Sequence, residues 1–169
     1  AYSDNRLWWV ISFGGLYRNG EDSKTIDFYT GFEFKVTPTL TLQFSPEIIA
    51  ENYNAQWLTS YSDNTATETY KRRYVFANLK QNTVVAEVRA DWIITSDLSL
   101  QVYLQPLIAA GKYDNFKVLK HPKSYNFMKY GEQGSSLIKT TFESGYSIYT
   151  LDADGEGPSN PKTIGDPNF

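Results

Sequence analysis

The chain has 169 residues, a size that allows one domain or a piece of one. It contains no cysteine, which excludes a disulfide scaffold, a thiol nucleophile and a thiolate metal site. Its net charge of −3 provides no broadly basic surface, so we expect no nucleic-acid partner. No apolar run approaches the roughly 20 residues of a membrane-spanning helix. The 13 Tyr and 10 Phe instead favour β-strands.

The first third of the chain predicts three strands, because apolar and polar residues alternate with a period of two. Strand one is expected at about 6–17, strand two at 25–36, and strand three from 40 to about 60. Polar residues at 19–22 and the sequence Thr-Pro-Thr at 37–39 predict the turns between them.

The clearest alternation lies between Asn82 and Ile108. It predicts a fourth strand at 74–94, a turn at Ser96–Asp97, and a fifth strand at 98–109. The length of these segments, about ten residues for each apolar stretch, matches strands that cross a membrane rather than strands of a small soluble sheet. The tight turns at 37–39 and 96–97 alternate with longer connections, another feature of barrels in the outer membrane.

The predicted fold class is therefore all-β, an antiparallel up-and-down transmembrane β-barrel. Eight strands are about the practical minimum for closure, so the chain is expected to be an incomplete barrel with about five to seven strands plus long outer loops. Residues 1–110 would hold strands one to five and their turns. Residues 111–169, where the alternation fades, would form a long outer-loop region in which 135–149 is a candidate short hairpin and 152–169 is loop.

This barrel assigns each strand residue to one of two sides. The residues expected to face the membrane are apolar: Phe28, Phe32, Phe34, Val84, Val88, Trp92, Leu98, Leu100, Val102 and Leu104. The residues expected to line the lumen are polar: Asp27, Glu33, Lys35, Glu87, Arg89, Asp91, Gln101 and Gln105. Aromatic residues near the expected strand ends predict interfacial girdles: Trp8, Trp9, Tyr17, Phe28, Trp92 and Tyr103. A sugar-stacking platform is the competing interpretation of these aromatics.

Four segments carry a family resemblance. They are RYVFANLKQNT at 73–83, TSDLSLQVYLQP at 95–106, GKYDNFK at 111–117 and PKSYNF at 122–127. In order and spacing they resemble a family of large Gram-negative outer-membrane proteins of unassigned function, in which a carbohydrate-binding-module-like (family-nine-like) sandwich precedes a C-terminal β-barrel. DADGEGP at 152–158 and DPNF at 166–169 also resemble segments of that family. The resemblance implies that this chain is an internal part of the barrel, and it supplies no catalytic residues.

The charged triplet Glu87, Arg89 and Asp91 allows three interpretations. A solvated or salt-bridged lumen wall is the simplest, since charges inside a barrel are ordinary. A lining that selects solutes by charge is the second. The third, an acid pair for glycoside hydrolysis, needs two carboxyl groups roughly 5–10 Å apart in a cleft, which a sequence cannot show.

Asp152, Asp154 and Glu156 stand at alternate positions and are followed by Gly157, as in the first half of a calcium-binding loop. Thr163 occupies the position where such a loop places its bidentate Glu, so an acidic surface turn is the competing interpretation. Ca²⁺ is the one candidate cofactor.

Two basic features remain. His121, the one histidine, precedes a proline and is expected to be a loop residue. Lys71, Arg72 and Arg73 predict a solvated loop end or a contact with anionic lipopolysaccharide groups.

The expected function is non-enzymatic. The chain would be an outer-membrane β-barrel segment of a large envelope protein, acting as a channel, an anchor or a component of an envelope complex. Its expected partners are outer-membrane lipid and lipopolysaccharide, with other envelope proteins as candidates. The alternative is a soluble β-sandwich or lipocalin-like module that binds carbohydrate or lipid. The alternation is the same in both cases. They differ in which face meets the surroundings: the polar face in a soluble module, the apolar face in a membrane barrel.

Overall fold

The computed structural model describes the backbone of residues 7–17 and 23–169, and side chains from residue 23 onward. It is all-β, with a single 3₁₀ turn (η1, Thr67–Thr69) among the described residues. Both sheets are antiparallel where their register is resolved. This confirms the predicted all-β antiparallel class, and neither sheet, as far as the structure describes it, closes into a barrel. None of the described residues forms a helix with the length and apolarity to cross a membrane.

The first sheet contains seven strands, β1 (Leu7–Tyr17), β2 (Lys24–Thr37), β3 (Leu40–Ser62), β4 (Arg72–Thr95), β5 (Leu98–Leu104), β6 (Leu107–Leu119) and β7 (Phe127–Lys129). Its order is β1-β2-β3-β4-β6-β7, and β5 also pairs with β4. The second sheet has the order β10-β9-β8, from β8 (Ser136–Thr141), β9 (Ser147–Asp152) and β10 (Lys162–Gly165).

The chain divides into two compact units. Unit 1 comprises Ala1–Arg18, Lys24–Glu51 and Gln81–Ala110; unit 2 comprises Asn19–Ser23, Asn52–Lys80 and Gly111–Phe169. The divisions near 51 and 80 were not predicted. They fall inside β3 and β4, which are 23 and 24 residues long, so these two strands contribute to both units.

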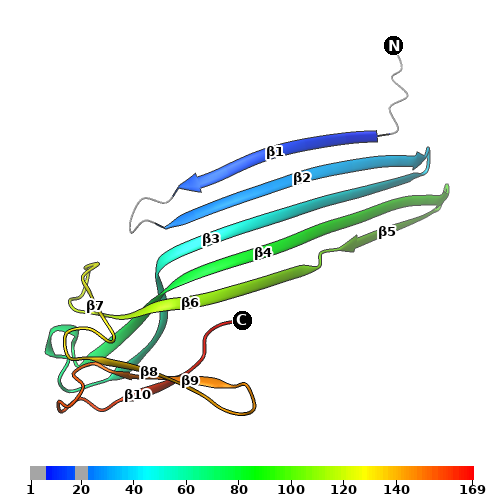
Figure 1. Cartoon of the computed structure of the whole chain (residues 1–169). Helices are drawn as coiled ribbons and strands as arrows, with labels where there is room; N and C mark the ends of the chain where they lie inside the picture. Colours follow the sequence, from blue (N-terminus) through cyan, green and yellow to red (C-terminus); the bar gives the residue numbers. More distant parts are fainter. Residues whose placement is uncertain (1–6, 18–22) are drawn as a thin grey trace. The chain divides into compact units, whose positions relative to one another are not determined.

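Unit 1 is a meander of long strands. Its strands lie side by side, and the two-residue turns between β2 and β3 and between β4 and β5 lie at the same end (Figure 1). The β4–β5 register contains an irregularity between Ile93 and Thr95, directly before the turn. The predicted fifth strand is divided into β5 and β6 at Gln105–Pro106. The division follows from Pro106, which has no N–H to donate to the ladder, although its carbonyl still accepts a hydrogen bond from Ala86 (3.1 Å).

Unit 2 is more ordered than the sequence predicted. β6 continues to Leu119, and the expected hairpin forms as β8 and β9. Residues 162–165, predicted to be loop, pair with β9 as β10. Eight buried residues form the core: Val75, Ala77, Phe116, Val118, Tyr130, Tyr149, Leu151 and Ala153. The rings of Phe116 and Tyr149 lie 4.6 Å apart, within the range for favourable aromatic pairs.

A change of phase inside β6 completes this core. Tyr113 packs against the core and so do Phe116 and Val118, although strict alternation would put 113 and 116 on opposite faces. Asn115 lies between them with φ +54°, the left-handed conformation that Asn tolerates better than most residues. A residue in this conformation interrupts the alternation between Tyr113 and Phe116 as a bulge does, which accounts for the contact of both residues with the core.

Candidate functional site

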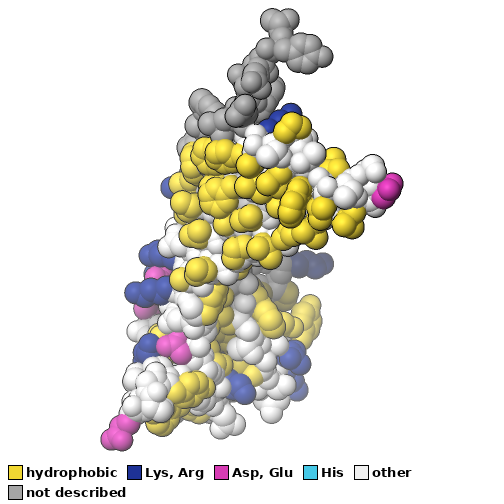
Figure 2. Space-filling view, turned by 90° about the vertical axis from the view of Figure 1, so that its right-hand side faces the viewer, with side chains coloured by type: hydrophobic (Ala, Val, Ile, Leu, Met, Phe, Trp, Pro, Cys, Tyr) yellow, Lys and Arg dark blue, Asp and Glu magenta, His cyan; other side chains and the backbone are white. Residues whose placement is uncertain are grey.

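Unit 1 has one face made of apolar side chains, and the register settles its composition. Opposite pairs are Val88 with Leu104, Ala90 with Val102, and Trp92 with Leu100. On the neighbouring strands, the rings of Phe32 and Phe44 stack with centroids 6.4 Å apart. Figure 2 shows hydrophobic side chains gathered into one broad field in the upper part of the view, where the strands of unit 1 lie. The predicted membrane-facing residues of β4 and β5 therefore share one face.

The opposite face is polar and internally bonded. Arg89 lies opposite Tyr103, and Asp91 lies opposite Gln101. The Arg89 Nε donates to Asp91 at 3.0 Å, and Gln43 Nε2 donates to Glu33 at 3.1 Å. Two of the residues predicted to line a lumen, Arg89 and Asp91, thus contact each other.

The two faces of unit 1 differ in composition, whereas both are largely exposed. The apolar side carries the exposed residues Ile26 (57% exposed), Val84 (49%) and Trp92 (45%). On the polar side Glu33 and Glu87 are half-buried, and Lys35 and Arg89 are exposed. A soluble sheet that is covered on one side buries its apolar face. None of these apolar side chains of unit 1 is buried.

Strand β4 contains both arrangements in one continuous element. In its first half the odd-numbered residues Val75, Ala77 and Leu79 are apolar and buried. The odd positions remain buried at Thr83 and Val85, and then become charged at 87, 89 and 91. The even positions change in the opposite sense, from Asn78, Lys80 and Asn82 to Val84, Val88 and Trp92. The burial keeps its phase along the strand from 75 to 85, and the hydrophobic pattern inverts between Asn82 and Glu87.

The apolar field extends over the same number of residues on two strands. On β2 it extends from Ile26 to Val36, and on β4 from Val84 to Ile94. Ten steps of roughly 3.4 Å give about 34 Å along each strand. At a tilt of about 45° this spans about 24 Å, which matches the apolar band about 25 Å tall of outer-membrane barrels.

Not all predicted site residues keep the expected position. Gln105 falls in the interruption between β5 and β6 rather than on a strand. Tyr103, a predicted girdle aromatic, lies opposite Arg89 on the polar face, as its place in the alternation indicates. The side chains of Trp8, Trp9 and Tyr17 lie outside the described residues. The remaining membrane-facing and lumen-lining positions follow the alternation of the strands on which they were predicted.

The predicted calcium loop is a turn in which aspartate side chains accept hydrogen bonds from nearby backbone N–H groups. Asp152 Oδ1 accepts the N–H groups of Asp154 and Gly155, at 3.3 and 3.2 Å, and Asp154 Oδ2 accepts that of Ser159 at 3.0 Å. In residues 23–169 no three His, Cys, Asp or Glu side chains are grouped to hold a metal ion. Asp152, Asp154 and Glu156 are therefore not brought together as ligands, and the arrangement fits the acidic-turn interpretation.

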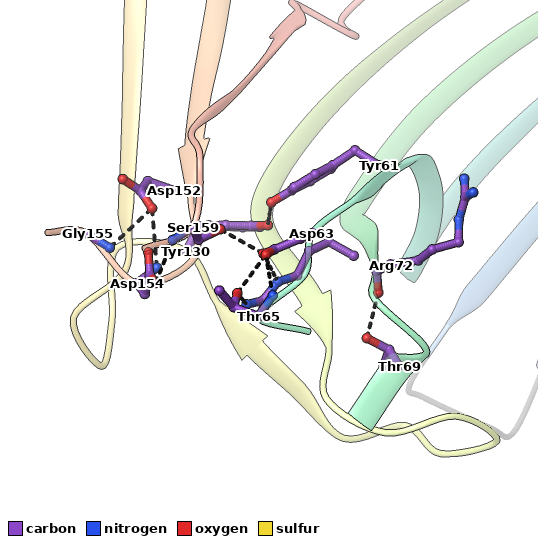
Figure 3. A network of polar contacts seen from close by, with 11 residues as sticks. Tyr61, Asp63, Thr65, Thr69, Arg72, Tyr130, Asp152, Asp154, Gly155 and Ser159 are labelled. Carbon is purple, nitrogen blue, oxygen red and sulfur yellow. Dashed lines mark hydrogen bonds and ion pairs between the residues drawn. The ribbon is translucent and has the colours of Figure 1, made fainter. Parts of the chain in front are cut away.

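Unit 2 holds a polar network that the sequence did not reveal (Figure 3). The carboxylate of Asp63 accepts hydrogen bonds from Arg73 Nε (2.7 Å), Ser159 Oγ (2.7 Å) and the hydroxyl of Thr65 (2.6 Å). Burial alone would raise the pKa of Asp63, but these bonds outweigh it and hold the pKa well below its ordinary value. Because Ser159 is 96 residues away, no local pattern could have identified this network.

A pair of tyrosines lies close to this network. The hydroxyls of Tyr61 and Tyr130 are 3.1 Å apart. Burial raises the pKa of both phenols, so both are neutral hydrogen-bonding groups at physiological pH. The pair joins β3 to the segment that follows β7 and serves structure rather than acid–base chemistry.

Comparison with known proteins found no relative: no family model, curated protein or solved structure matches the chain.

Proposed function

We propose that the chain is a β-barrel segment of an outer-membrane protein, in which unit 1 spans the bilayer and unit 2 lies in water. The observation that carries the proposal is the exposed apolar face of unit 1, about 24 Å tall, with a polar face on the other side of the same strands. The function is that of a channel, an anchor or a component of an envelope complex, without catalysis. The family resemblance described above agrees with this assignment.

The inversion along β4 supports the same proposal. Where a barrel strand lies in lipid, its outer face is apolar and its inner face polar. Where the strand continues into water, the inner face packs an ordinary core and the outer face becomes polar. β4 follows this sequence, with the core residues Val75, Ala77 and Leu79 at one end and exposed Val84 and Trp92 toward the other.

The alternative is a soluble sandwich or lipocalin-like module. Such a module would bury the apolar side chains of unit 1 inside a core. Leu100 and Leu104 instead remain 47% and 57% exposed in the described structure. This exposure favours the membrane over the soluble alternative.

The test is a gel-mobility experiment on protein extracted from membranes, with and without boiling in SDS. A folded membrane barrel resists SDS and changes mobility when it is boiled. We expect such a shift, and a boiled mass well above 19.3 kDa would additionally identify the chain as part of a longer protein. Recovery in the soluble fraction without detergent, with no shift on boiling, would refute the proposal and leave the soluble module.

A further inference from the structure

A bipartite groove lies within unit 2, between segments that are distant in sequence. Two adjoining cavities of about 240 and 210 Å³ share Thr69 and Leu119 in their walls. The walls come from residues 65–76, around η1 and the start of β4, and from 118–128, around the end of β6. Each cavity lies below the roughly 300 Å³ of a typical small-molecule site, and together they fall within that range.

Both halves of the groove carry a lysine. The charged or titratable lining residues of the first half are Glu68, Arg73, Lys120 and His121. Arg73 is paired with Asp63, and the Glu68 carboxylate lies 3.6 Å from His121 Nδ1. The Lys120 ammonium donates a hydrogen bond to the neutral amide of Gln133 at 3.4 Å. With Lys123 in the adjoining half, the groove has two ammonium groups beside the one carboxylate of Glu68, which favours an anionic ligand.

The other half is aromatic. It is lined by Thr69, Tyr70, Tyr74, Phe76, Leu119, Pro122 and Lys123. Tyr70 is 80% exposed, so most of its ring is available for contact, and it adopts φ +57°, an uncommon conformation for an aromatic residue. Lys123 places a second ammonium in the wall of this half.

We propose that this groove binds an anionic sugar, a hexopyranose that carries a carboxylate or a phosphate. The apolar face of the pyranose ring would pack on Tyr70 and Tyr74, because the ring's C–H groups point to that face while its hydroxyls lie at the edge. The anionic group would lie between Lys120 and Lys123, where it meets two ammonium donors. Binding by unit 2 goes beyond the proposed barrel function and does not rest on it.

The experiment is isothermal titration of the whole protein in detergent with four probes. These are a galacturonic acid trisaccharide, mannose 6-phosphate, maltotriose and inorganic phosphate. We expect at least one acidic sugar to bind at least about tenfold more tightly than both maltotriose and phosphate. Preference for the phosphorylated sugar would indicate a lipopolysaccharide-type source, and preference for the uronate an acidic polysaccharide; either supports the proposal.

Variants identify the site. Lys120→Ala combined with Lys123→Ala, and Tyr70→Ala separately, should each weaken binding by about tenfold. Matched controls are Lys80→Ala and Tyr146→Ala, which remove an exposed lysine and an exposed tyrosine from other parts of the chain and should leave affinity unchanged.

Three outcomes would overturn the proposal. Equal binding of maltotriose would remove the role of the lysines. Equal binding of inorganic phosphate would remove the role of the ring. Absence of binding, or affinity lost equally in the control variants, would show that the groove is not a sugar site.

Discussion

A single arginine placed on the apolar face of unit 1 should distinguish lipid from water as its surroundings. Val102 lies on this face, opposite Ala90, and is 38% exposed. It follows Leu98, the first residue after the tight turn, by four steps of about 3.4 Å. At a tilt of about 45° this places Val102 about 10 Å into an apolar band about 25 Å tall, near the middle.

The expected cost of Val102→Arg follows from that depth. An arginine near the midplane of a lipid-facing barrel surface destabilises by about 2–4 kcal/mol, whereas one near the interface costs about 0–1 kcal/mol. Leu98→Arg, next to the turn, is therefore the depth control. Gln101→Arg, on the polar face opposite Asp91, is the face control and should change stability by less than about 0.5 kcal/mol.

The assay is reversible urea unfolding of the whole protein in lipid vesicles, followed by tryptophan fluorescence. The order of destabilisation should be Val102→Arg first, then Leu98→Arg, then Gln101→Arg. A partly exposed position in a soluble protein tolerates arginine with little loss. Equal, small effects at Val102 and Gln101 would therefore refute the membrane assignment of this face.

The remaining predictions concern unit 2. Asp63→Ala should destabilise unit 2 by about 3 kcal/mol, because Arg73 is left half-buried without its carboxylate partner. Arg73→Ala should cost a similar amount, and thermal unfolding would measure both. The pKa of Asp63 is lowered in the folded state, so its contribution to the free energy of unfolding should be fully present above about pH 4 and decline as the pH falls further. Acid titration followed by circular dichroism would measure this decline, and a constant stability down to pH 2 would contradict it. Gly111→Ala should release the C-terminal segment, because the new Cβ would lie 2.5 Å from the Phe169 ring. Hydrogen exchange at the Phe169 amide, which donates to the Gly111 carbonyl, should then accelerate, and unchanged protection would contradict this contact. Asn115→Gly should be tolerated, whereas Asn115→Val should cost about 1–2 kcal/mol in unfolding titrations, and equal stability of both variants would refute the role of the left-handed bulge.

The strands of unit 1 could be predicted from the sequence because each has a local signal. Alternation of apolar and polar residues defines β2, β4 and β5 without reference to the rest of the chain. The two-residue turns at 38–39 and 96–97 then fix which strands are neighbours. The assignment of strand residues to an apolar or a polar face follows from the same period of two.

The order of unit 2 could not be predicted for two physical reasons. In β6 the bulge at Asn115 resets the alternation, so Tyr113 and Phe116 do not read as one face in the sequence. The four residues of β10 form a strand because they pair with β9. A segment of this length and composition carries no strand signal of its own in the sequence. The bond from Ser159 to Asp63 is similarly a product of tertiary structure, as is the groove near Thr69.

The pattern inversion in β4 has a consequence for which changes in length the strand tolerates. A single residue inserted between Leu79 and Val84 would rotate everything beyond it to the opposite face. The charged positions 87, 89 and 91 would then move to the apolar side, while Val88 and Trp92 would move to the polar side, with the core residues 75, 77 and 79 unchanged. An insertion of two residues would keep every residue on its face and move only the position along the strand at which the hydrophobic pattern inverts. Natural variation in the length of this strand should therefore proceed in pairs of residues, because only an even change keeps every later residue on its face.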